Sequence, residues 1–329
     1  MFIVDQVSKV YRTKERKGFF KREWKEVEAV TDLSFHMEPG KIIGLLGING
    51  AGKTTTIKMC ATLLEPSSGS INVDGLDAVK HDRQVKAMVN MIAGGERMLY
   101  WRLTGRENLV YFGSLYGLTG ESLAARIAQL LKQVGLEEAA DTPVERYSKG
   151  MKQRLQIARG LINDPKYIFL DEPTLGLDAP IARHLRQHVK ELATEQGKAI
   201  LLTSHYIHEV EELCDEVYII NKGKLVAHDT PEKLTKSLFK ESTLRVTVPF
   251  LPESLARDLH HLTRSERGRW ETVELPESAS VELVFRSESD LTTDVIAALA
   301  KNHIPVLRLT TEQPSLEDVI LHLAERRSA

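Results

Sequence analysis

The stretch "GINGAGKTTT", residues 47–56, decides which fold this sequence can adopt. It fits the pattern G-x-x-x-x-G-K-[ST], follows the apolar run "KIIGLL" and opens a helical pattern that continues toward Leu64. Glycines in such a loop let successive backbone N–H groups point inward at phosphate oxygens, and the start of the helix adds partial positive charge. A tight glycine-rich turn without a ligand is the simpler interpretation, but Lys and Thr in register favour a phosphate-binding loop.

The loop predicts how a nucleotide is held, but it does not identify the base. Lys53 is expected to reach the β- and γ-phosphates, and the Thr54 hydroxyl to ligate Mg²⁺. The Asn-Lys-x-Asp element of a GTPase is matched only by "NKGK" at residues 221–224, which lacks the Asp and fits a hairpin turn. The predicted nucleotide-binding residues of the loop are Gly47, Asn49, Gly50, Ala51, Gly52, Lys53, Thr54 and Thr55.

Two further strand ends carry candidate catalytic residues. The strand pattern "YIFLDEP" ends on Asp171, expected at the Mg²⁺ site, and on Glu172, which can deprotonate an attacking water. Such a pair also fits a solvated turn, but after a phosphate loop it favours hydrolysis. The third run, "ILLTSH", ends at His205. A histidine at a strand end is often structural, yet parallel strands deliver their last residues to the ligand edge of a sheet.

Composition narrows the class of protein. The chain has 329 residues and a net charge of -2, so it has no global attraction to nucleic acid or anionic lipid. Its cysteines, Cys60 and Cys214, lack metal-ligand spacing and suit a reducing compartment. No run approaches the roughly 18 apolar residues of a membrane span, so work at a membrane would need a second chain that crosses it.

The order of patterns along the chain predicts an α/β protein with a small C-terminal α+β domain. Strand and helix patterns alternate from Phe2 to about Leu234, with a mostly helical part between about residues 106 and 163. From Thr243 we expect strand, helix, strand, strand, helix and strand, then a last helix from Ser315, a ferredoxin-like order. The predicted domains are therefore 1–234 and 235–329.

The order "GINGAGKTT", "YSKGMKQR", "YIFLDEPTLGLD", "LLTSH" resembles the ATP-binding cassette (ABC) ATPases over residues 1 to about 234. The resemblance implies a P-loop NTPase with a RecA-like parallel sheet, an antiparallel β subdomain and a helical subdomain at about 94–163. It also implies ATP and Mg²⁺ as ligands. By the same resemblance, Ser148 and Gly150 contact the γ-phosphate held by another copy of the chain, and Asp178 lies in the loop between the copies. His205 senses the γ-phosphate.

Three details of the resemblance need separate statement. Tyr11 corresponds to the aromatic that stacks on adenine, although an ordinary edge-strand aromatic is an alternative. The signature reads Ser-Lys-Gly-Met where Ser-Gly-Gly-Gln is commonest, which adds a positive charge near the phosphate. The glutamine that normally touches Mg²⁺ and water would fall at Gly95, so either Glu96 beside it replaces that contact or the contact is missing.

The pieces "YGL", "TSHY" and "PSLEDVILHL" are similar to ATPase subunits of exporters whose membrane permease is a separate chain. This likeness implies a homodimer of the chain under two permease subunits, peripheral to the cytoplasmic face of the cell membrane, with no nucleic acid bound. The alternative is a soluble cassette ATPase that remodels ribosomes or DNA. Such proteins usually carry two cassettes, coiled coils or zinc modules, for which this sequence has no pattern.

The segment "RTKERKGFFKREWKEVE", residues 12–28, is unusual for a compact cassette. If it is helical, Phe20, Trp24 and Val27 share one face, which predicts an amphipathic element at lipid headgroups or the permease. The alternative is a solvated hairpin with scattered aromatic residues.

Overall fold

A computed structural model describes residues 1–17, 21–93, 99–238, 242–265, 268–275, 280–312 and 315–325. Glu96, Phe19 and Phe20 lie outside these ranges. The chain forms two compact units, Met1–Pro231 with Leu323–Ala329, and Glu232–His322. The predicted domain boundary at residues 234 and 235 stays a prediction. No described helix combines the length and the apolar character that crossing a bilayer requires.

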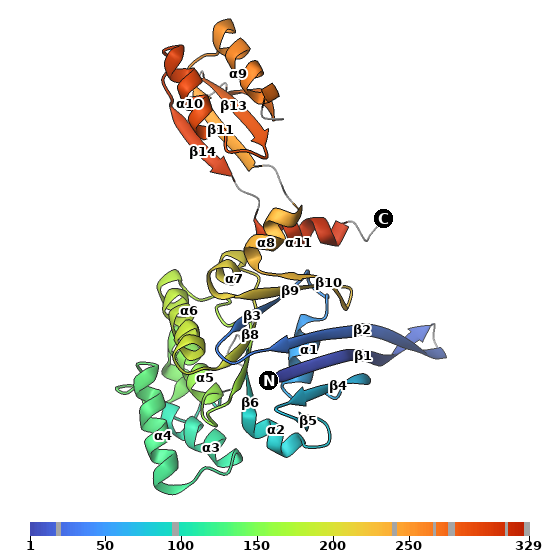
Figure 1. Ribbon diagram of the computed structural model, residues 1–329. Helices are drawn as coiled ribbons and strands as arrows, with labels where there is room; N and C mark the ends of the chain where they lie inside the picture. Colours follow the sequence, from blue (N-terminus) through green and yellow to red (C-terminus); the bar gives the residue numbers. More distant parts are fainter. Residues whose placement is uncertain are drawn as a thin grey trace. The chain divides into compact units, whose positions relative to one another are not determined.

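The first unit is built on a sheet whose buried strands are parallel (Figure 1). Its order among the described residues is β10-β9-β3-β8-β7-β6, and only the β9–β10 pair is antiparallel. Every residue of β3 and β8 is buried, as their continuous apolar sequences predict for strands covered on both faces. The strands are β3 (Ile42–Leu46), β6 (Val89–Ala93), β7 (Tyr167–Asp171), β8 (Ala199–Thr203), β9 (Glu216–Asn221) and β10 (Lys224–Asp229).

Helix α1 (Lys53–Cys60) packs its buried residues into a core shared by this sheet and a second, antiparallel sheet. Ile57 and Met59 lie there with Phe2 of the second sheet and Phe169 of the first. The predicted RecA-like sheet with an antiparallel β subdomain is thereby confirmed. The second sheet has the order β2-β1-β4-β5 and consists of β1 (Phe2–Lys17), β2 (Lys21–Met37), β4 (Ser68–Val73) and β5 (Leu76–Asp77).

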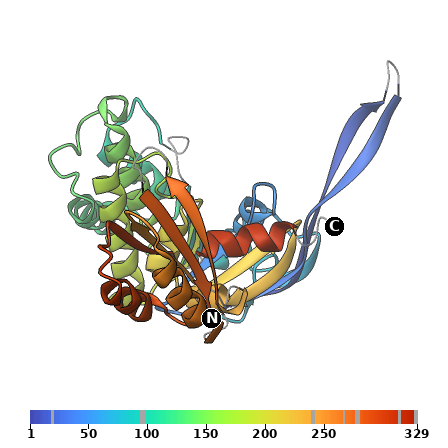
Figure 2. The same ribbon diagram turned by 90° about the horizontal axis from the view of Figure 1, so that it is seen from above.

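The helical interpretation of residues 12–28 is wrong, because the described residues 12–17 and 21–28 belong to the paired antiparallel strands β1 and β2 (Figure 2). Arg12 lies opposite Glu26, and their side chains form an ion pair of 2.8 Å between Nε and Oε1. Opposite charges on facing strand positions stabilise a hairpin. The side chain of Trp24 is mostly exposed, as the alternative of a solvated hairpin predicts.

The predicted helical part is confirmed. Helix α3 begins with a capping box between Thr104 and Glu107. Helix α4 buries Leu123, Ile127, Leu130 and Leu131 at helical spacing and ends before Gly135, which has a φ of 62°. The helices of this part and of the first unit's remaining surface are α2 (Asp82–Met88), α3 (Gly105–Leu115), α4 (Gly120–Gln133), α5 (Lys149–Gly160), α6 (Ala179–Thr194) and α7 (Ile207–Leu213), with a 3₁₀ turn at Val144–Arg146.

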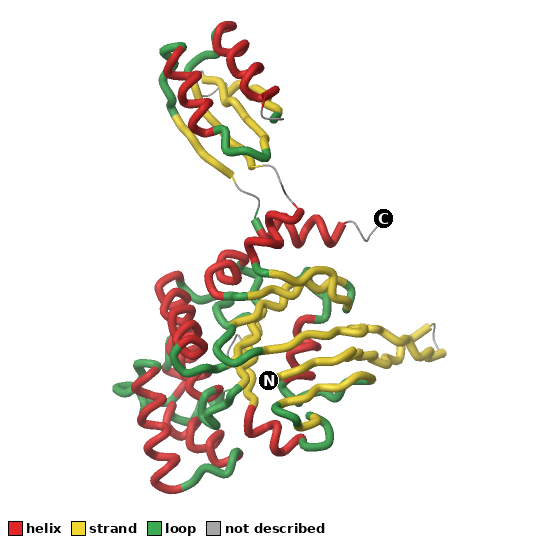
Figure 3. The backbone as a smooth tube through the Cα atoms, viewed as in Figure 1, coloured by secondary structure: helices red, strands yellow, loops and turns green. Residues whose placement is uncertain are grey.

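The second unit has the predicted ferredoxin-like order. Its sheet runs β12-β13-β11-β14 with every neighbouring pair antiparallel, and α9 and α10 cover one face (Figure 3). Val246, Leu259, Phe285 and Leu299 lie in its core. Its elements are β11 (Ser242–Val248), α9 (Glu253–Ser265), β12 (Arg269–Leu275), β13 (Ser280–Ser287), α10 (Thr292–Lys301) and β14 (Arg308–Glu312). Helices α8 (Pro231–Leu238) and α11 (Leu316–Glu325) each include residues of both units.

Candidate active site

The phosphate-loop candidate joins β3 to α1 and needs glycine for steric reasons. Gly52, the residue before α1, has a φ of 107°, and a Cβ there would lie 2.4 Å from the Ala29 carbonyl oxygen. A Cβ at Gly47 would lie 2.2 Å from the Ile220 carbonyl oxygen. Because backbone atoms cannot yield as a flexible side chain can, the loop conformation depends on these two glycines.

The Lys53 side chain lies under the loop. Its Nζ donates to the carbonyl oxygens of Gly47 at 2.7 Å and of Ile48 at 3.2 Å. Burial lowers the pKa of Lys53, while the charges of Glu172 and Asp171 act in the opposite direction. The Lys53 amino group therefore bonds to the loop backbone, and it is close enough to the predicted catalytic carboxylates for their charges to act on it.

The adjacent strands β3, β8 and β7 bring the predicted residues to one edge of the sheet. Asp171 and Thr203 are register partners at the ends of β7 and β8, and the Thr203 hydroxyl donates to Asp171 Oδ1 at 2.7 Å. Thr203 is fully buried. The sequence analysis missed this residue, although its place at the end of the strand before His205 was a usable signal.

Glu172 and His205 are in direct contact. His205 Nε2 lies 2.7 Å from Glu172 Oε1, which is within ion-pair distance. Glu172 has a φ of 54°, in the left-handed region that non-glycine residues seldom occupy, and its N–H donates to the Thr203 carbonyl at 3.0 Å. This backbone turns the carboxylate away from the strand direction and toward the loop after β8.

A buried polar group that the sequence analysis also missed connects the loops after β7 and β8. Glu209 of α7 is 2 % exposed and accepts hydrogen bonds from the hydroxyls of Ser204 and Thr174. Burial raises the pKa of Glu209, although the two hydroxyls partly offset it. No sequence signal marked this residue, because its partners come from two separate loops.

The signature residues lie beside the segment that leads into α6. Ser148 caps α5, and its Oγ accepts from the Met151 N–H at 3.2 Å. A Cβ at Gly150 would lie 2.4 Å from Ile181 Cδ1 of α6. Among the described residues, no hydrogen bond or ion pair joins Ser148 or Gly150 to residues 47–55 of the same chain. Asp178 is exposed before α6, and its side chain makes no capping bond.

The remaining predicted residues are Tyr11, expected at the adenine, and Thr54, expected at the metal. Tyr11 lies on β1 opposite Val27, with Lys9 Nζ 5.8 Å from its ring centroid, and it is half-buried. Thr54 is exposed in the first turn of α1. The Thr54 hydroxyl and the Asp171 carboxylate supply oxygen atoms, which Mg²⁺ prefers as ligands. The described residues hold no cluster of three or more His, Cys, Asp or Glu that would form a separate metal cage.

Comparisons with known proteins give a consistent result. The family model "ABC transporter" matches residues 30–175. The ABC transporter ATP-binding protein NatA of Bacillus subtilis is 46 % identical over 218 residues, which cover 66 % of this chain and 88 % of NatA. The Nod factor export ATP-binding protein I of Burkholderia orbicola is 35 % identical over 301 residues, 90 % of this chain and 92 % of that protein. A solved structure of an ATP-binding subunit of an ABC transporter superposes with a TM-score of 0.60 and 29 % identity, covering 72 % of this chain and 92 % of that one.

Proposed function

Because this chain belongs to the family of ABC transporter ATP-binding proteins, we propose that it powers an exporter as a homodimer bound to a separate membrane permease chain. ATPase activity follows from the family. Export is supported by the relative that matches 90 % of this chain and is named a Nod factor export ATP-binding protein. In this arrangement the chain is peripheral to the cytoplasmic face of the membrane, and the helical part around α3 and α4 receives the permease.

The observation that carries the proposal is the contact of Glu172 with His205 at the sheet edge that also holds the phosphate loop. Lys53 and the backbone N–H groups of the loop bind the β- and γ-phosphates, with Lys53 exchanging its two carbonyl acceptors for phosphate oxygens. Thr54 and Asp171 would hold Mg²⁺, which neutralises charge on the phosphate oxygens. Glu172 takes the proton of the attacking water, and His205 can turn from Glu172 to the γ-phosphate.

The second part of the proposal is that two copies share each site. Ser148 is exposed at the start of α5, a helix of 12 residues whose first N–H groups favour an anion. Among the residues that the structure describes, no hydrogen bond joins this helix start to the phosphate loop of the same chain. We infer that Ser148 and Gly150 complete the site of the second copy, with Asp178 at the contact between copies and Tyr11 against the adenine.

The experiment mixes two inactive variants. In a dimer of one Lys53→Ala chain and one Ser148→Arg chain, both lesions fall on one composite site, while the other site has an intact Lys53 and an intact Ser148. Each homodimer has two damaged sites. We therefore expect partial ATPase activity on mixing and none from either variant alone, with hydrolysis rising faster than linearly with protein concentration.

A structural readout accompanies the activity. Crosslinks from position 148 should form to residues 47–55 of the other chain, which isotope labelling of one chain can distinguish. Crosslinks only within one chain would refute the shared site. If mixing the two variants also restores no ATPase activity, the dimer mechanism is refuted as well. Co-purification with a polytopic membrane protein tests the permease partner separately.

A further inference from the structure

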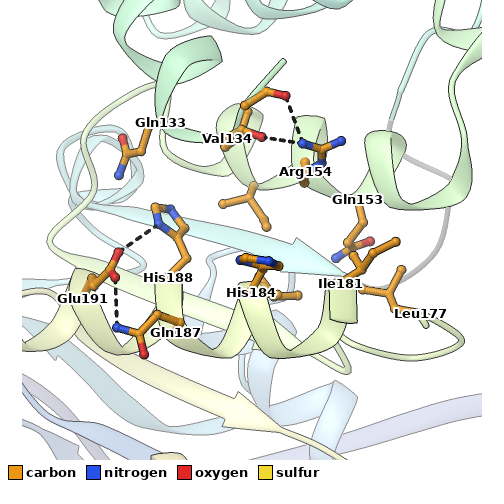
Figure 4. A pocket seen from close by; sticks show the side chains of 13 residues that line it. Gln133, Val134, Gln153, Arg154, Leu177, Ile181, His184, Gln187, His188 and Glu191 are labelled. Atoms are coloured by element: carbon orange, nitrogen blue, oxygen red, sulfur yellow. Dashed lines mark hydrogen bonds and ion pairs between the residues drawn. The ribbon is translucent and has the colours of Figure 1, made fainter. Parts of the chain in front are cut away.

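A pocket of about 420 Å³ lies between the end of α4, the middle of α5 and the first three turns of α6 (Figure 4). None of the described residues that line it belongs to the phosphate loop or to the ends of β7 and β8. Sites for small molecules commonly have volumes of about 300–1,000 Å³. The pocket is therefore large enough for a ligand of its own.

One end of the pocket presents a hydrogen-bond donor without a partner. Gln153 of α5 is 6 % exposed, and its Nε2 has no hydrogen-bond partner among the described residues. Figure 4 shows this side chain beside Ile181 of α6. A buried N–H group without an acceptor is unfavourable, so an acceptor on a bound molecule would be stabilising here.

The other end presents an acceptor. His188 Nε2 is also buried without a partner among the described residues, and its Nδ1 lies 3.8 Å from Glu191 Oε2. Burial lowers the pKa of His188, although Glu191 partly offsets this, which favours the neutral ring. With the proton on Nδ1, toward Glu191, Nε2 accepts a hydrogen bond. His188 follows Ile181 by seven residues on α6, which separates the two polar ends by about 10 Å.

The charged groups of the pocket already have partners. Arg154 Nη1 donates to the carbonyl oxygens of Val134 at 3.2 Å and Gly135 at 2.9 Å. Glu191 Oε1 accepts from Gln187 Nε2 at 3.0 Å. Arg154 and Glu191 carry opposite charges and are both already bonded, so they leave little net charge in the pocket. An ionic ligand would lose its hydration shell there without gaining a counter-ion.

We propose that this pocket binds an uncharged amphipathic small molecule. Its apolar body packs against Ile157, Ile181 and Leu185, its acceptor meets Gln153 and its donor meets His188. No part of the family comparison or of the ATP chemistry assigns a ligand to this place.

The position of the pocket couples its occupant to ATP hydrolysis. Ile181 lines the pocket and also contacts Gly150 of the signature, where a Cβ would lie 2.4 Å from its Cδ1. Helices α5 and α6 begin next to Ser148 and Asp178, so a molecule that fixes their spacing also fixes these two residues. This coupling rests on the proposed shared site.

The binding test uses 1-naphthaleneacetamide, which has an apolar ring system and an uncharged amide with both donor and acceptor. Binding to the nucleotide-free protein is measured by saturation-transfer NMR. His184 is exposed and lines the pocket, so His184→Trp should fill the opening and weaken binding at least tenfold. The matched control is Arg183→Trp, which adds the same ring at an exposed neighbour that does not line the pocket, and should bind as the wild type does.

A third variant tests the donor. Gln153→Leu keeps the volume and removes the amide, and should weaken binding by about tenfold, the effect of one hydrogen bond. Equal binding by the wild type and His184→Trp, or no binding by the wild type at millimolar probe, overturns the site.

The coupling has its own readout. Saturating probe should change the ATPase rate of the wild type at least twofold and leave that of His184→Trp unchanged. An unchanged wild-type rate with the probe bound overturns the coupling. Because the mixing of Lys53→Ala and Ser148→Arg chains uses no probe, the proposed function can fail or stand independently of this result.

Discussion

Replacing Thr203 by Val should weaken the proposed Mg²⁺ binding by Asp171 without disturbing the fold around it. Val has the shape of Thr and fills the same buried space, but it removes the hydroxyl that donates to Asp171 Oδ1 at 2.7 Å. The backbone bond from Glu172 N–H to the Thr203 carbonyl is unaffected, so the turn after β7 is kept. The variant therefore isolates one hydrogen bond to the carboxylate.

The magnitude follows from the kind of bond lost. A hydrogen bond to a charged group contributes about 1.5–3 kcal/mol, which corresponds to a change of about 10- to 150-fold in an equilibrium constant. Loss of a partner that orients a metal ligand typically costs about 10–100-fold in metal affinity or activity. We therefore expect the Mg²⁺ concentration for half-maximal ATPase activity to rise by about 10- to 100-fold.

The assay measures ATP hydrolysis against Mg²⁺ concentration at fixed ATP. Thr203→Ser keeps the hydroxyl and loses only the methyl group, so it should retain the wild-type Mg²⁺ dependence. Thermal melting of both variants without Mg²⁺ separates a metal effect from a loss of folding. A folded Thr203→Val protein with the wild-type Mg²⁺ dependence would show that Asp171 is not oriented through Thr203.

Two more predictions concern single carboxylates. Glu172→Gln should still bind ATP but hydrolyse it on the order of 10²- to 10⁴-fold more slowly, because an amide cannot take the water proton; normal phosphate release would place the base elsewhere. Burial opposes ionisation of Asp74, but hydrogen bonds from the Met1 amine, Tyr167 and Lys166 outweigh it and hold its pKa below the usual value. The contribution of ionised Asp74 to the free energy of unfolding is fully present above the unfolded pKa of about 3.9, and it is lost as pH falls through the folded pKa. In urea denaturation, the stability of Asp74→Asn should therefore fall less at acid pH than that of the wild type. Identical pH profiles would contradict this.

The sequence predicted most where one pattern fixes both structure and chemistry. The run from Ile42 to Lys53 combines the patterns of a buried strand, a glycine-rich loop and a helix start. Few backbone conformations are compatible with these three patterns in succession. The apolar residues of α4 likewise recur with the helical period, and they are the buried residues of that helix. Local periodicity was sufficient in these cases because each element's own residues decide its form.

The sequence predicted least where partners distant in the chain decide the outcome. Residues 12–28 carry charge at most positions, so neither a helical nor a strand period stands out, and the pairing of Arg12 with Glu26 decides for a hairpin. The bond from Thr203 to Asp171 depends on the register of β7 against β8. The pocket beside Gln153 depends on how α5 packs on α6, which no local pattern encodes.

The contact of His205 with Glu172 has a consequence for when the cell's ATP is hydrolysed. In the single chain, the Glu172 carboxylate already has the His205 imidazole 2.7 Å away. In the dimer proposed above, the imidazole leaves Glu172 for the γ-phosphate of the completed site. That proposal implies that a single subunit hydrolyses little ATP, and that ATP is used only after the transporter has assembled.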